Sequence, residues 1–170
     1  MNAALLVLRV VVGLLFAGHG AQKLFGWFGG HGLRNTAGFF ERLGFRPGLP
    51  FAFLAGAAEL GGGLLLAAGL FVPAAALLVA GVMASAIAAV HWRKGLWNQN
   101  GGIEFPLTMA TVAFAVAAIG PGTFSLDHAF GIDWHGIWWA VGAVGVGALG
   151  GLTSLVPGRR PGERHLRRVA

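Results

Sequence analysis

The chain has 170 residues, of which 56% are hydrophobic and only 11% are charged. Soluble domains carry about 25% charged residues, so this composition excludes a soluble globular domain and indicates a protein that lies in lipid. The absence of cysteine excludes disulfides, thiol catalysis, iron–sulfur clusters and cysteine-ligated zinc. The net charge of +6 does not predict nucleic-acid binding, because the basic residues lie in short segments between apolar runs, where membrane proteins carry orientation signals.

Apolar runs follow one another along the chain, and a spanning helix needs about 20 such residues. They cover residues 3–25, 50–70, 72–92, 105–119 and 134–156. The high glycine content, 30 residues, fits this interpretation, since small residues let membrane helices approach closely. The sequence therefore predicts an all-α fold, a membrane-spanning four-helix bundle with an extra fifth transmembrane helix. The lipid bilayer is its first partner.

The connections between the runs differ in length and character. Residues 69–73 predict a tight hairpin, with Pro73 in the first turn of the next helix. Residues 34–43 predict a short amphipathic helix that lies on or dips into the membrane, and Ser125 predicts the cap of a short segment containing Asp127. We expect a four-helix transmembrane domain over residues 1–130, an extra transmembrane helix over 131–157, and a basic disordered tail over 158–170.

The charges of the connections predict an orientation. Lysine and arginine gather in residues 26–49, in residues 93–104 and in the tail, whereas the connection over 120–133 carries only Asp127 and Asp133. Five spans place all three basic segments on one side, which the positive-inside rule makes cytoplasmic, with the N-terminus outside. Four spans cannot do so unless the fifth run lies in the interface, so the charges favour five.

Glu59 is the first candidate for chemistry, because a carboxylate in the middle of a span is costly unless it is paired, protonated or hydrated. His19 and Lys23 are four residues apart and share one helix face, which small residues could turn toward Glu59. We take Glu59, His19 and Lys23 as the candidate catalytic residues. The alternative is structural: Glu59 pairs with Arg9 or Lys23 and locks the helices together.

Further polar residues near the spans are candidates for cofactor binding. His91 closes the third run, and a histidine there could hold a quinone carbonyl. Arg9 lies in the first run, and Glu104 opens the fourth, where a carboxylate also complements a helix N-terminus. We take His91, Arg9 and Glu104 as the candidate cofactor-binding residues. Their spacing matches no known metal motif, and we predict no metal site.

An ordered set of residues resembles the DoxX family of small bacterial membrane proteins. The resemblance runs through the first two spans, continues with Gly69-Leu70 and His91, and ends in Glu104-Phe105-Pro106 and the segment from Gly120 to Asp127. It implies a four-helix fold in the bacterial inner (plasma) membrane, and a membrane-embedded redox role. Family members usually have both termini inside, which contradicts the orientation that the charges predict; the conflict stays open, and we favour the orientation of the charges, with the N-terminus outside.

Three functions are compatible with these sequence features. The first is the membrane subunit of a quinone-linked oxidoreductase, in which Glu59 and His19 exchange protons while a soluble partner supplies electrons. The second is a non-enzymatic anchor or assembly scaffold for a soluble partner, in which Glu59 matters only for folding. A small-solute transporter ranks last, because the chain shows no repeat or broken helix of the kind that transporters use. Each of these functions is compatible with a homo-oligomer.

Overall fold

The computed structural model describes residues 2–155. Within this range every regular element is helical, as the sequence predicts. The α-helices are α1 (Asn2–Phe25), α2 (Gly32–Arg42), α3 (Gly48–Ala68), α4 (Val72–Ala86), α5 (Glu104–Ile119), α6 (Leu126–Ala129) and α7 (Ile137–Thr153). Three single turns lie between α4 and α5: the π-helical η1 (Ile87–His91) and the 3-10 turns η2 (Trp92–Lys94) and η3 (Asn98–Asn100).

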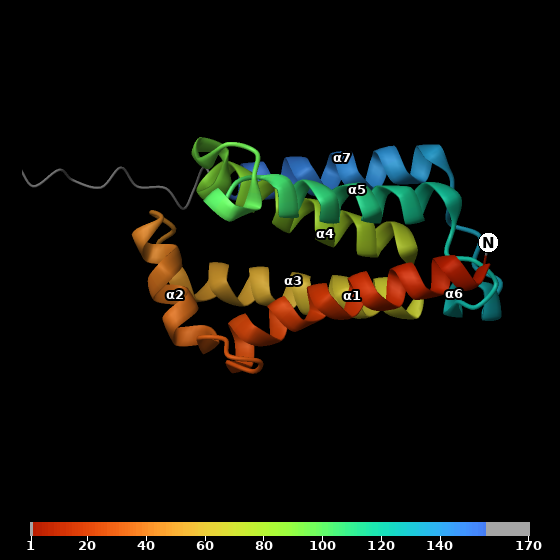
Figure 1. The fold of residues 1–170 in the computed structure, drawn as a ribbon, viewed down its shortest axis with the longest axis horizontal. Helices are drawn as coiled ribbons and strands as arrows, with labels where there is room; N and C mark the ends of the chain where they lie inside the picture. The colour runs from red at the N-terminus through yellow and green to blue at the C-terminus, as the bar shows by residue number, and fades with distance from the viewer. Residues whose placement is uncertain (1, 156–170) are drawn as a thin grey trace, which may run out of the picture.

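The apolar helices fall into two length classes. Helices α1 and α3, and α4 with its continuation through η1 and η2 (Val72–Lys94), are long and apolar enough to cross a membrane. Helices α5 and α7 are apolar but have only 16 and 17 residues. Figure 1 shows α7 alongside α4 and α5, not across an end of the bundle, which supports the extra membrane helix. The domain division at residue 130 stays a prediction, and the basic tail lies outside the described residues.

The bundle has two layers (Figure 1). Helices α1 and α3 pack side by side in one layer, and α4, α5 and α7 form the other. The α3–α4 hairpin joins the layers at one end, near α6, while α2 lies across the opposite end. The core between the helices consists of side chains from both layers, among them Phe16, Leu66, Val79, Met83 and Val116.

Glycine allows close approach at two helix crossings. Where α1 crosses α3, a Cβ atom on Gly13 would lie 2.6 Å from both the carbonyl oxygen of Gly63 and the amide nitrogen of Ala67. Where α4 crosses α7, a Cβ atom on Gly151 would overlap the carbonyl oxygen of Gly81. In both places the backbones touch because a side chain is missing, the arrangement that small residues provide in membrane helices.

Asp127 fixes the end of the bundle where the hairpin lies. Its carboxylate accepts hydrogen bonds from the backbone N–H groups of Phe71 at 2.8 Å and Val72 at 3.2 Å, the first groups of α4, which otherwise lack partners. Ser125 caps α6 by accepting from the N–H of His128 at 3.2 Å, as predicted. The buried carboxylate of Asp127, from a segment distant in the sequence, thus stabilises the hairpin end of the bundle.

The basic connections meet at one end of the molecule. Helix α2 and the turns between α4 and α5 lie together at the end opposite the hairpin (Figure 1). This end carries Arg34, Arg42, Arg46, Arg93 and Lys94. Asp127 and Asp133 belong to the segment between α5 and α7, at the hairpin end. The sequence predicts that these two basic connections share one end of the bundle, opposite the acidic connection, and the structure agrees; the basic tail, on which the choice between four and five spans depends, lies outside the described residues.

Candidate functional site

A cavity of about 730 Å³ lies inside the bundle and is lined by α1 to α5, η1 and α7. Most of its wall is apolar. The ionisable residues on the wall are Lys23 and His19 of α1, Glu59 of α3 and His91 of η1. A concave, mostly apolar space with a few convergent polar groups is the usual form of a small-molecule site, so we take this cavity as the candidate site.

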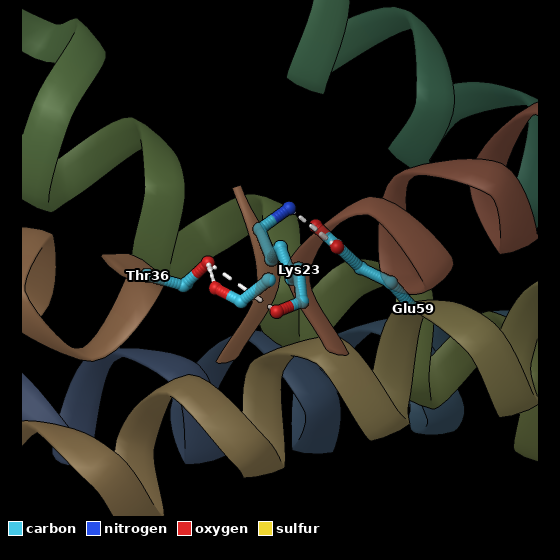
Figure 2. A network of polar contacts seen from close by, with 4 residues as sticks. Lys23, Thr36 and Glu59 are labelled. Carbon is cyan, nitrogen blue, oxygen red and sulfur yellow. Dashed lines mark hydrogen bonds and ion pairs between the residues drawn. The ribbon is translucent and has the colours of Figure 1, made fainter. Parts of the chain in front are cut away.

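Lys23 and Glu59 form an ion pair across the cavity wall. Figure 2 shows the Lys23 Nζ atom pointing at the Glu59 carboxylate, with Nζ and Oε2 2.5 Å apart. The Glu59 side chain is only 5% exposed, while that of Lys23 is 29% exposed. The pair joins α1 to α3 in the way that the structural alternative describes, with Lys23 as the partner of Glu59. It also presents a charged donor and a charged acceptor to the cavity.

The sequence brings this pair together through glycine. A Cβ atom on Gly20 would lie 2.6 Å from the carbonyl oxygen of Gly56, so the two backbones touch there. Lys23 and Glu59 each follow these glycines by three residues, about one helical turn along. Because α1 and α3 run antiparallel, the two residues lie on opposite sides of this contact, and the long Lys23 side chain reaches back across it to the Glu59 carboxylate.

Helix α2 is tied to the same place. The Thr36 hydroxyl lies 3.4 Å from the carbonyl oxygen of Lys23 and 2.8 Å from that of Gly32, so it can donate to either (Figure 2). Thr36 is buried, and its attachment positions α2 over the end of the cavity. Phe39 and Phe40 of α2 then contribute aromatic surface to the cavity wall.

The two histidines line the cavity from different helices. The His19 ring packs edge-on against Phe105 of α5, with centroids 5.3 Å apart. The His91 Nδ1 atom lies 2.6 Å from the carbonyl oxygen of Gly101. A carbonyl can only accept, so Nδ1 carries the hydrogen, and in the neutral ring Nε2 is left as an acceptor. The loop before α5 thereby fixes the tautomer of His91.

Arg9 and Glu104 lie elsewhere, and neither is among the residues within 2–155 that line the cavity. Arg9 is fully buried near the hairpin end, where its guanidinium donates to the carbonyl oxygens of Ala67 and Phe124. Glu104 is exposed and accepts from the backbone N–H of Asn98 at 2.7 Å. The structure thus gathers His19, Lys23, Glu59 and His91, and gives Arg9 and Glu104 contacts with backbone groups instead.

Some features of the candidate site were not predicted from the sequence. The π-helical turn η1 places His91 beside the cavity, and such turns occur frequently at functional sites, but the sequence carries no signal for it. The aromatic residues Phe39 and Phe40 could have been found, since the amphipathic pattern of residues 34–43 already marks an apolar face. Among the described residues, no group of three or more histidine, aspartate or glutamate side chains could hold a metal ion.

The family model described as DoxX matches residues 4–92, just over half of the 170 residues. The chain belongs to the DoxX family. Every ionisable residue on the cavity wall lies inside the DoxX match, whereas α5, α6 and α7 lie outside it. No curated protein and no solved structure matches the chain. Its DoxX domain and its apolar helices make it a multi-pass integral membrane protein.

Proposed function

We propose that this DoxX protein is the membrane subunit of a quinone-linked oxidoreductase in the bacterial inner membrane, and that it binds the quinone head group beside Lys23 and Glu59. One observation carries the proposal: the cavity of about 730 Å³ is mostly apolar and carries one set of ionisable side chains. Its volume falls in the range of roughly 300–1,000 Å³ that is typical of ligand sites.

The donors and acceptors on the wall fit a quinone. Quinone carbonyls only accept hydrogen bonds, and Lys23 Nζ has three hydrogens, of which Glu59 engages one. The Nε2 acceptor of His91 suits the hydroxyl of the reduced form. Lys23 would therefore hold one ring oxygen, and His91 is available to the product.

Proton transfer is the second requirement. When bound, a quinone supplies two-electron redox chemistry, taking two electrons from a redox-active partner subunit together with two protons. Glu59 and His19 are titratable groups on the same cavity wall, and proton exchange with a reacting oxygen needs such groups within hydrogen-bond reach. In the Lys23–Glu59 contact, the ammonium group is a proton donor and the carboxylate is a proton acceptor. Both groups belong to the protein and remain in place during proton transfer to the quinone.

The test is retention of quinone by the purified full-length protein. We expect quinone to be extracted from the wild-type protein isolated in mild detergent, and to be lost from Glu59→Gln. Asp133→Asn is the matched control, because Asp133 is 87% exposed and pairs with His135 outside the cavity. Absence of quinone from the wild-type protein, with no binding of added quinone, would contradict the proposal.

The anchor or scaffold function is the second candidate, and the ion pair favours it. A Lys23–Glu59 contact at 2.5 Å gives Glu59 a structural partner without any ligand, and the basic end offers charge to a soluble partner. This function predicts that a soluble protein co-purifies from membranes and is lost when residues 158–170 are deleted. It also predicts that Glu59 variants change stability only, which the quinone measurement separates from the first proposal.

A further inference from the structure

Helix α7 contributes a continuous strip to the cavity wall. The strip consists of Val146, Gly147, Gly150, Gly151 and Ser154, which recur every three or four residues and so share one helix face. It carries no ionisable group, and the Ser154 hydroxyl donates to the carbonyl oxygen of Gly151 at 2.7 Å. The strip therefore offers the cavity an apolar surface, from a helix that the DoxX match does not include.

The three glycines of the strip differ in what surrounds them. A Cβ atom on Gly147 would meet the backbone of Leu77, and one on Gly151 would meet that of Gly81, so both glycines serve the packing of α7 on α4. A Cβ atom on Gly150 would have no described atom within 4 Å. Gly150 nevertheless lines the cavity. Its missing side chain enlarges the cavity and is not required by the helix crossing.

The strip is long and reaches the outside of the bundle. From Val146 to Ser154 it rises about 12 Å at 1.5 Å per residue. Leu54 of α3 also lines the cavity, and Leu54 and Val146 are 62% and 60% exposed. In a membrane-spanning bundle such exposed leucine and valine face lipid. This part of the cavity suits a hydrocarbon chain, because a polar group there would lose its hydrogen bonds with water.

We propose that α7 forms the tail subsite of the ligand cavity, and that the ligand is a quinone with a long prenyl tail and not a short, water-soluble one. The inference rests on the proposed quinone site, which holds the head group at Lys23 and Glu59. The tail then runs along α7 past Gly150 and leaves between α3 and α7, where Leu54 and Val146 meet the lipid.

The test measures binding of two probes to the full-length protein in lipid nanodiscs: a benzoquinone with a long polyprenyl tail, and the same ring with a single prenyl unit. Gly150→Leu should weaken binding of the long-tailed probe at least about tenfold, the discrimination that a hydrophobic pocket achieves for one methylene group, and leave the short one unchanged. Gly142→Leu is the matched control, because Gly142 is also on α7 with open space around it but does not line the cavity.

A second pair of variants guards against misfolding of the first. Leu54→Trp narrows the cavity from the α3 side, while Leu64→Trp changes an exposed leucine of the same helix outside the cavity. Only Leu54→Trp should discriminate between the probes. If both cavity variants weaken the two probes equally, or neither variant weakens the long-tailed one, the tail subsite is refuted while the quinone site stands. If the wild-type protein binds neither probe, the proposed function itself fails.

Discussion

Replacing Lys23 by methionine removes the positive charge from the cavity wall and leaves the Glu59 carboxylate without its partner. The two atoms of the ion pair are 2.5 Å apart, and the Glu59 side chain is 5% exposed. Breaking a buried pair by removing one member costs about 3–5 kcal/mol, whereas replacing both members by groups of similar volume is often neutral. The double variant Lys23→Met/Glu59→Gln should therefore be more stable than either single variant.

The two single variants should differ in cost. Lys23 is 29% exposed, so after Glu59→Gln its ammonium group can still reach water, and we expect a loss near 3 kcal/mol. After Lys23→Met the carboxylate stays enclosed at 5% exposure, and we expect a loss near 5 kcal/mol. The order of the two losses follows from the exposures alone.

Equilibrium unfolding in mixed micelles, followed by circular dichroism, measures these differences. Lys94→Met serves as the charge control, because Lys94 is exposed in η2, and we expect a change of no more than about 0.5 kcal/mol. If the double variant lost as much unfolding free energy as the two single variants together, the two charges would not interact, and the reasoning would be refuted. A stable double variant that binds no quinone would separate the structural role of the pair from its chemical one.

Three further predictions concern the fold. Gly63→Leu should prevent close packing of α1 on α3 and abolish folding or lower the melting temperature strongly, whereas Gly61→Leu, with open space around its Cβ position, should be tolerated; equal melting temperatures would contradict the crossing. Asp127→Ala should cost about 2 kcal/mol or more, because two backbone N–H groups at the start of α4 lose their acceptor, and unchanged hydrogen exchange there would argue against the cap. Since the chain has no cysteine, single cysteines introduced at the exposed Leu96 and Phe130 can be labelled from each side of the membrane. The positive-inside rule predicts that position 96 is labelled from the cytoplasmic side and position 130 from outside. The reverse labelling would support the orientation usual in the family.

The helices could be predicted closely because their signal is local. The apolar runs over residues 3–25 and 50–70 correspond to α1 and α3 within two residues at each end, and the amphipathic stretch at 34–43 corresponds to α2. The run over 105–119 agrees with α5 within one residue, but the last run, predicted to begin at Trp134, differs more, because α7 begins only at Ile137. Hydropathy shows where apolar residues lie. It does not show where a helix begins, because that depends on the backbone geometry of the first turn.

The site was only partly accessible to the same reasoning. The spacing of His19 and Lys23 marked the correct face of α1, and Glu59 stood out because a charged residue is costly in a span. Arg9 carried the same signal as Glu59, but in the structure its two terminal nitrogens donate to backbone carbonyl oxygens at the hairpin end. The sequence alone does not show whether Arg9 or Lys23 reaches Glu59. That choice depends on the antiparallel packing of α1 on α3, which sets which part of α1 lies beside Glu59.

The orientation of the bundle decides which compartment exchanges protons with the cavity. Lys23 lies in the last turn of α1, beside α2, and His91 precedes the basic turn η2, so these ionisable groups lie toward the basic end. If that end is cytoplasmic, as its arginines predict, the protons taken up in the proposed quinone reduction would come from the cytoplasm. If the family orientation holds, they come from outside, and the same reaction has the opposite effect on the proton gradient. The cysteine-labelling result thus fixes the direction of proton uptake as well as the topology.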